Sequence, residues 1–117
     1  MQTSYAPAGL ISGHIDVILL QIISLEDGYG YSISKTIARL ADCEVKEATL
    51  YAGLRRLEGE KLIASYWGDE SQGGRRKYYT LTEEGAHQLA IGRAKWEMTK
   101  QLMDRILNYP NGGTPHA

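Results

Sequence analysis

The sequence predicts an α+β fold in which three helices, a two-stranded β-hairpin and one long closing helix follow each other along the chain. Apolar residues recur at helical steps in three segments between residues 10 and 60. Two short runs then alternate with the two-residue period of a strand, and a glycine-containing loop joins them. The helical period returns at residue 83 and continues to residue 107 without a proline.

Composition limits the chain to a few classes of protein. Its 117 residues suffice for one domain, and its 43% hydrophobic content argues against a disordered or fibrous chain. The net charge of -1 gives no general attraction to nucleic acid, so such a function would depend on where the cations lie. Because the single cysteine cannot form an internal disulfide and the N-terminus lacks the pattern of a signal peptide, we expect a cytoplasmic protein. The apolar run at residues 15–25 is too short to cross a membrane.

The N-terminal part of the chain should form two helices. Ile15, Ile18 and Ile22 lie at steps of three or four, and neighbouring apolar residues widen this stripe. The first helix should therefore be buried against more than one neighbour. The predicted segments are, in order, a flexible stretch at residues 1–9, a helix at 10–25, a turn at 26–31 and a second helix at 32–41.

The third helix, expected at residues 46–60, has one apolar face and one face of small side chains. On a helical wheel, Leu50, Leu54 and Leu57 form the buried stripe. The opposite face centres on Ala52, with arginines at its edge. A merely solvated face would normally carry glutamate and lysine. Small side chains instead let a helix approach a partner closely, and arginines hold anions.

The hairpin is expected from strands at residues 62–68 and 76–82, and its tip places two glycines before three adjacent cations. Glycine lets the loop bend and approach phosphate closely, while the cations supply the opposite charge. Alternation should put Tyr79 and Leu81 on one face of the second strand, and Tyr78 and Thr80 on the other. The alternative interpretation is a solvated hairpin with routine surface charges.

The last helix, expected at residues 83–107, carries an apolar seam along its whole length. Thr82 is suited to cap its start. A helix of ~25 residues is nearly 40 Å long, which exceeds what a globule of this size can cover. We therefore expect the uncovered part to meet a second copy of the chain, although a helix packed fully on its own domain is the alternative. The seam repeats at seven residues through Leu89, Trp96 and Met103, with the companion set Gly92, Thr99 and Ile106.

This order of elements describes a winged helix-turn-helix, in which the third helix enters the DNA major groove and the hairpin, or wing, lies over the backbone or minor groove. We expect residues 10–82 to form the DNA-binding domain, residues 83–108 a dimerisation helix and residues 109–117 a flexible tail. The predicted partner is a pseudo-palindromic double-stranded operator bound by a homodimer. The predicted DNA-binding residues are Lys46, Thr49, Tyr51, Ala52, Arg55, Arg56, Gly74, Arg75, Arg76, Lys77 and Tyr78.

The sequence also resembles the short form of the PadR family of bacterial transcriptional regulators. The resemblance rests on "ATLYAGLRRLEGEKLIASYW" at residues 48–67 and "GGRRKYYTLTEEG" at residues 73–85. It implies a homodimeric winged-helix repressor whose last helix packs on its mate. Two positions depart from the family pattern. No serine or asparagine stands near Lys46 to cap the third helix, and Lys61 occupies the place of a glycine after it, so the end of that helix could be shifted.

The resemblance extends to Trp96, because multidrug-sensing members of the family carry a tryptophan on the last helix that lines a pore between subunits. Paired indoles of a dimer could clasp a small planar aromatic effector, or Trp96 could simply fill the dimer core. Asp16 and Lys100 could orient such a ligand or merely be solvated. The residues assigned to the ligand or dimer interface are Ile11, Ile15, Leu19, Leu89, Gly92, Arg93, Trp96, Thr99, Lys100, Met103 and Ile106.

Other classes of function have weaker support in the sequence. The three histidines and Cys43 have no metal-ligand spacing, no nucleophile and base occur together, and the glycines near residue 28 lack a nucleotide-loop pattern. We therefore expect no enzyme, no cofactor and no metal. Two rivals stay open: a winged helix that binds protein partners instead of DNA, and a ligand-buffering protein without regulatory function.

Overall fold

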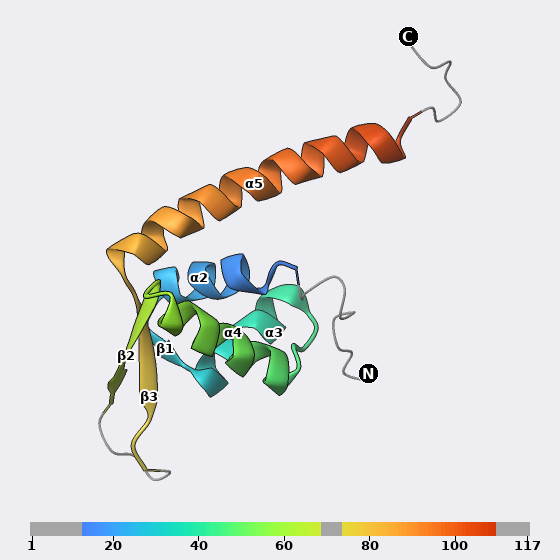
Figure 1. Cartoon of the computed structure of the whole chain (residues 1–117). Coiled ribbons are helices and arrows are strands. Elements are labelled where there is room, and N and C mark those ends of the chain that lie inside the picture. The colour runs from blue at the N-terminus through green and yellow to red at the C-terminus, as the bar shows by residue number, and fades with distance from the viewer. Residues whose placement is uncertain (1–12, 69–73, 110–117) are drawn as a thin grey trace.

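The computed structural model describes residues 13–68 and 74–109, and their elements follow the predicted α+β order (Figure 1). Residues 1–12, 69–73 and 110–117 lie outside it, together with the predicted flexible N-terminus and most of the predicted tail. The elements are α2 (Ile15–Leu25), β1 (Gly28–Tyr29), α3 (Gly30–Ala41), α4 (Glu47–Gly59), β2 (Ile63–Trp67), β3 (Lys77–Leu81) and α5 (Glu83–Leu107).

The prediction that the first helix runs on from Leu10 was wrong for Gly13 and His14. Both residues form a turn, and His14 has the non-helical angles φ -128° and ψ 3° at the N-cap of α2. Glycine disfavours a helix because it loses the most backbone freedom on folding. The apolar pattern alone did not reveal this break.

Strand β1 was predicted as part of a turn, but it pairs antiparallel with β3 through Gly28 opposite Tyr79 and Tyr29 opposite Tyr78. Strand β3 therefore lies in the centre of a three-stranded sheet of order β1-β3-β2. The second helix also begins earlier than predicted. Ser32 closes its start, because the Tyr29 backbone N–H donates to Ser32 Oγ at 3.0 Å, and that hydroxyl donates to the Tyr29 carbonyl at 2.9 Å. A two-residue strand offers too little periodicity to be recognised in a sequence.

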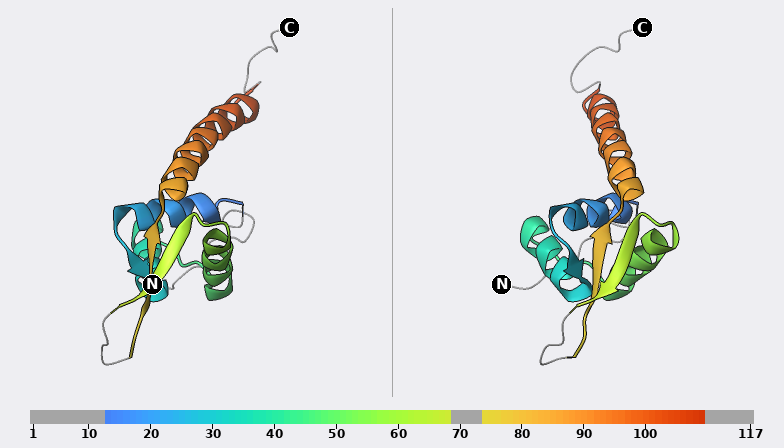
Figure 2. Two further views of the ribbon diagram at one scale, coloured as in Figure 1. Left: turned by 60° about the vertical axis from the view of Figure 1, so that its left-hand side comes forward. Right: turned by 90° about the vertical axis from the view of Figure 1, so that its left-hand side faces the viewer.

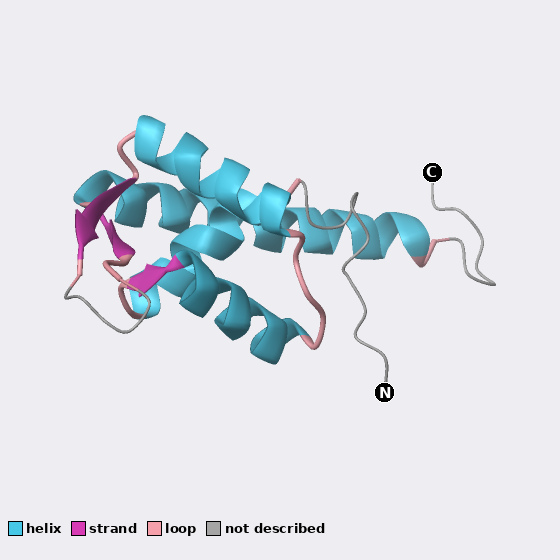
Figure 3. Ribbon diagram, turned by 90° about the horizontal axis from the view of Figure 1, so that it is seen from below, coloured by secondary structure: helices cyan, strands magenta, loops and turns pink. Residues whose placement is uncertain are grey.

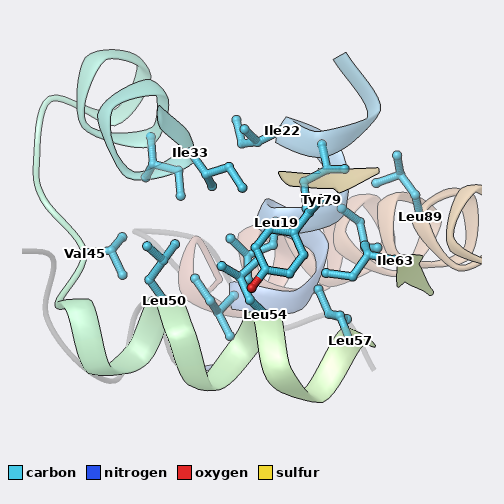
Figure 4. Packing of buried hydrophobic residues seen from close by; sticks show 14 residues of the cluster. Leu19, Ile22, Ile33, Val45, Leu50, Leu54, Leu57, Ile63, Tyr79 and Leu89 are labelled. Atoms are coloured by element: carbon cyan, nitrogen blue, oxygen red, sulfur yellow. The ribbon is translucent and has the colours of Figure 1, made fainter. Parts of the chain in front are cut away.

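The core lies between α2, α3, α4 and the sheet, and Figure 4 shows its side chains converging from these elements. Helix α4 contributes the predicted stripe of Leu50, Leu54 and Leu57, each of which is almost fully buried. The predicted split of β3 also holds on its inner side, because Tyr79 is buried against this core. The leucine stripe fixes the rotation of α4, so the face centred on Ala52 points outward.

Both ends of α4 show the consequences of the two unusual residues. Lys46 stands at the N-cap without a side-chain hydrogen bond. After the last helical residue, Gly59, Lys61 adopts the left-handed angle φ 64° that glycine would favour. The turn is therefore not shifted; Lys61 itself takes the strained conformation, at a typical cost of about 1 kcal/mol.

Helix α5 starts against the sheet and then leaves the body of the protein, as Figures 1 and 2 show. Thr82 caps it as predicted, since Thr82 Oγ1 accepts from the Gly85 backbone N–H at 3.0 Å. The same hydroxyl group approaches the Leu62 carbonyl oxygen at 2.9 Å. The first part of α5 packs on α2, whereas every described residue from Arg93 onward is exposed. No helix in the described ranges is both long enough and apolar enough to cross a membrane.

Three residues assigned from sequence to the ligand or dimer interface belong instead to the core of the chain itself. Ile15, Leu19 and Leu89 are 4%, 0% and 7% exposed in the single chain. Helix α2 is apolar around most of its circumference, so its pattern could not show which stripe faces the chain's own α4 and which faces outward. Ile11, from the same set, lies outside the described residues.

Candidate nucleic-acid interface

Helix α4 and the hairpin of β2 and β3 lie on the side of the protein opposite α5 (Figure 1). Figure 3 views this side, from below. On α4, Lys46, Ala48 and Arg55 are exposed, while Thr49 and Ala52 are half-buried. The face is thus formed by short side chains with cations at its edges, as the sequence predicted. Such a shape allows a helix to lie deep in a groove.

Tyr51 is partly used in packing between helices. A Cβ atom placed on Gly30 would lie 2.1 Å from the Tyr51 hydroxyl oxygen, so this ring fills the space that a side chain at the start of α3 would need. Tyr51 also packs against the core while staying half-exposed. Its rotamer is therefore set by α3 before any ligand arrives.

The two arginines of α4 have different surroundings. Arg56 Nε donates to Asp16 Oδ2 at 3.3 Å, and Arg56 Nη2 also contacts Asp16 Oδ1, so one edge of the guanidinium is bound by both oxygens of a carboxylate of α2. This pair raises the pKa of Arg56. Arg55 is exposed and forms no ion pair within the part of the chain that the structure describes. A phosphate would meet Arg55 directly but would compete with Asp16 for Arg56.

The three adjacent wing cations do not form one block, because alternate residues of a strand face opposite sides of a sheet. Lys77 lies on the inner face, 3.3 Å from Oε1 of Glu58 on α4. A hydrogen bond from Ser65 lowers the pKa of Glu58, and Lys77 lowers it further. Arg75 lies over the Trp67 ring, 5.4 Å from its centroid. No sequence pattern had identified Glu58, which joins the wing to α4.

Arg76 occupies the outer face of the wing, 4.6 Å from the centroid of the Tyr29 ring. Tyr78 stacks on Tyr66 with centroids 5.7 Å apart and meets the edge of Tyr29 at 5.3 Å. Tyr66 in turn donates a hydrogen bond of 2.6 Å to Asp27, which raises the pKa of Tyr66. The hairpin is therefore supported by strand β1. The tyrosines at residues 29, 66 and 78 are the sequence signal that could have revealed this contact between β1 and the hairpin.

The turn of the wing is described only at its end. Gly74 has φ 93°, a conformation that side chains rarely adopt, which agrees with the predicted need for glycine. Gly73 and the preceding loop lie outside the described residues. The exposed side chains of Arg75 and Arg76 follow directly.

Trp96 lies on the other side of the molecule, between two hollows. It meets the edge of His14, with ring centroids 5.3 Å apart. One hollow of about 390 Å³ lies between the first half of α2, the end of α4 and the middle of α5, and one of about 760 Å³ lies among α2, α3 and α5. Trp96 lines both and is 47% exposed. The sequence had left it open whether Asp16 and Lys100 orient a ligand. In the single chain, Asp16 pairs with Arg56, and Lys100 Nζ lies 3.0 Å from Oε2 of Glu97.

The remaining seam of α5 is largely uncovered in the single chain. Gly92 lies against Val17 of α2, since a Cβ atom there would come within 3.0 Å of it. Beyond it, the apolar side chains are exposed: Met98, Leu102, Met103, Ile106 and Leu107. Among the described residues, no three potential metal ligands come together.

Comparison with known proteins places this geometry in a family. The chain matches the sequence profile of the "Transcriptional regulator PadR-like family" over residues 19–91. It is 42% identical over 100 residues to the "Uncharacterized protein X" of Lysinibacillus sphaericus, a match covering 84% of this chain and 92% of that protein. It is 31% identical over 91 residues to "Transcriptional regulator YqjI" of Escherichia coli, covering 76% of this chain and 42% of that regulator, so the chain spans less than half its length.

Solved structures agree with the sequence matches. A PadR family transcription regulator from Clostridium difficile R20291 has 43% identity and a TM-score of 0.72, with 81% of this chain and 99% of that chain covered. A transcriptional regulator from Clostridium thermocellum has 38% identity and a TM-score of 0.77, with 83% and 96% covered. The winged-helix fold predicted from the order of elements is therefore confirmed.

Proposed function

Because the chain belongs to the PadR-like family, a family of transcriptional regulators and not of enzymes, we propose that it is a homodimeric repressor that binds a pseudo-palindromic operator. Family membership implies DNA binding. The observation that carries the residue-level proposal is that α4, with its exposed small and cationic side chains, and the cationic wing both lie on the side of the protein opposite α5 (Figure 1). A duplex laid across that side would meet both features at once.

The proposed division of labour follows from side-chain size and charge. Lys46, Thr49 and Ala52 lie near base edges in the major groove, because short side chains let α4 approach the bases. The exposed cations Arg55, Arg75 and Arg76 hold phosphates, and Tyr51 and Tyr78 offer hydroxyl groups to the backbone. Lys77 holds the wing against α4 through its ion pair with Glu58, and Gly74 provides the backbone conformation of the turn. These contacts position the protein without requiring an excess of positive charge over the whole chain.

Dimerisation is proposed from the uncovered seam of α5. The seam residues Trp96, Met103 and Ile106 are each close to half-exposed or more, although they lie on one 25-residue helix that projects from the domain. A second copy that packs its own α5 alongside would cover them. The two wings and the two α4 helices would then reach half-sites about one helical turn apart, or a multiple of it. A regulator of this kind acts in the cytoplasm, where bacterial DNA lies.

The direct test is a gel shift with the full chain and the duplex that lies upstream of its own gene. We expect saturable binding that weakens steeply between about 50 and 200 mM salt, because phosphate contacts release counterions. Sedimentation of the same sample should give a dimer. Binding that ignores salt, or a monomer at the concentrations used, would contradict the proposal and favour a protein-interaction module.

We further propose that a small planar aromatic effector binds beside Trp96 and relieves repression. The indole is half-exposed next to two hollows, so a flat ring can reach it. Titration of the wild-type protein with planar aromatic dyes should quench its tryptophan fluorescence, and Trp96→Ala should remove that response. Trp67→Phe is the matched control, because Trp67 lies on the wing and should not affect quenching by the dye. An unchanged response in Trp96→Ala would contradict the assignment and leave Trp96 as a dimer-core residue.

A further inference from the structure

The contact between α2 and α4 is unusually close at one point. A Cβ atom placed on Gly53 would lie 2.7 Å from Leu19 Cδ1 and 3.4 Å from Ile15 Cγ1, so no side chain separates the two helices there. Asp16 and Arg56 meet at the edge of this contact. Their side chains are 46% and 44% exposed, so the pair forms at the surface. The position of the pair is therefore set by the buried packing beneath it.

Arg56 differs from Arg55 in having an ion-pair partner, although both are exposed arginines on α4. Its Nε and Nη2 atoms face the Asp16 carboxylate, which cancels its charge locally. Arg55 has no such carboxylate among the described residues. A phosphate could bind Arg56 only by displacing the Asp16 carboxylate, so the loss of this ion pair would offset part of the gain from releasing the counterions condensed on the DNA.

We propose that Asp16 limits sequence-independent DNA binding by withholding Arg56 from the phosphate backbone. The inference rests on the proposed function, and it assigns a role to a residue outside α4 and the wing. Phosphate contacts add affinity for every sequence equally and carry no sequence information directly. Removing one cation from the DNA-facing helix therefore lowers background binding to the many non-operator sites of a genome. Discrimination gained by weakening the wrong complexes is a general route to specificity.

The test measures binding of the full chain to a random-sequence duplex of about 30 base pairs, long enough for two half-sites. Fluorescence anisotropy is followed between about 50 and 200 mM KCl. Because the substitution changes both subunits of the dimer, Asp16→Asn should bind roughly ten- to fifty-fold more tightly at about 0.1 M salt, with a salt slope steeper by about 1.8, as expected for two added phosphate contacts. Asp16→Glu, which keeps the charge, should stay near the wild type.

The neighbouring arginines supply matched controls. Arg56→Gln should bind nearly as the wild type does, whereas Arg55→Gln removes one phosphate contact from each subunit and should lose roughly ten- to fifty-fold in affinity. In an Arg56→Gln background, Asp16→Asn should have no further effect. Because exposed ion pairs contribute little to folding, these variants should keep the wild-type unfolding temperature.

Two results would overturn the inference alone. One is an Asp16→Asn variant with wild-type affinity and salt slope. The other is an equal gain from Asp16→Asn in the presence and absence of Arg56, since that would reflect only the loss of a negative charge near DNA. Failure of the wild-type chain to bind any duplex in a salt-dependent way would instead overturn the proposed function, and this inference with it.

Discussion

Gly85→Ala should destabilise the protein by about 3 kcal/mol, because the added methyl group has no space to occupy. A Cβ atom at this position would lie 1.9 Å from the Leu62 carbonyl oxygen and 2.8 Å from Leu81 Cδ1. The first neighbour is backbone and cannot rotate away. The same carbonyl group lies 2.9 Å from the Thr82 hydroxyl oxygen that caps α5. The clash would therefore disturb the start of α5 and its attachment to the sheet.

The measurement is thermal unfolding at a fixed protein concentration, with an expected decrease of roughly 10 to 20 °C in Tm. Gly59→Ala is the matched control, since nothing lies within 4 Å of a Cβ atom placed there. It adds a methyl group to an exposed helical position and should stabilise α4 by roughly 0.5 to 1 kcal/mol. Equal melting temperatures for the two variants would show that the approach of α5 to Leu62 is looser than described.

Arg75→Ala combined with Arg76→Ala should weaken binding to all DNA sequences alike. The two cations lie on opposite faces of the wing, over Trp67 and over Tyr29, so they would hold separate phosphates. The double variant removes two phosphate contacts from each subunit of the dimer, so it should flatten the salt slope by about 3.6 and reduce affinity by a factor of roughly one hundred or more near 0.1 M salt.

The control for this double variant removes the same charge elsewhere. Arg39 lies in the last turn of α3 and Arg105 in the last turn of α5, and both are exposed. Their double alanine variant should keep the salt slope of the wild type. If the wing variant also kept its slope and affinity, the wing would not contact the backbone and the cations would serve only the packing of the hairpin.

The sequence was sufficient to predict features that rest on a long periodic pattern. The leucine stripe of α4 and the full extent of α5 repeat over several turns, so their phase could be determined from residue spacing alone. The turn residue Gly74 and the cap Thr82 were predictable because their local chemistry is specific to turns and helix starts. The family resemblance at residues 48–67 and 73–85 agreed with these assignments.

The features that sequence could not supply all depend on contacts between distant segments. Asp16 and Arg56 are 40 residues apart, and Tyr66 and Asp27 are 39 apart. Strand β1 has only two residues, so it is recognisable only once it pairs with β3. Helix α2 is apolar around most of its circumference, so its sequence does not show which of its sides packs against α4. The burial of Leu19 in the core depends on that packing. Such choices are made by tertiary packing.

The joint between β3 and α5 restricts which changes of sequence this protein can accommodate. A single residue, Thr82, separates the last residue of β3 from the first residue of α5, and its hydroxyl group is anchored near the Leu62 carbonyl. The direction of the wing and the axis of α5 are therefore set by the same joint. An insertion in the first turn of α5 would rotate the rest of that helix against the wing by about 100° per added residue, because an α-helix has 3.6 residues per turn. We therefore expect this junction to tolerate changes of side chain more readily than changes of length.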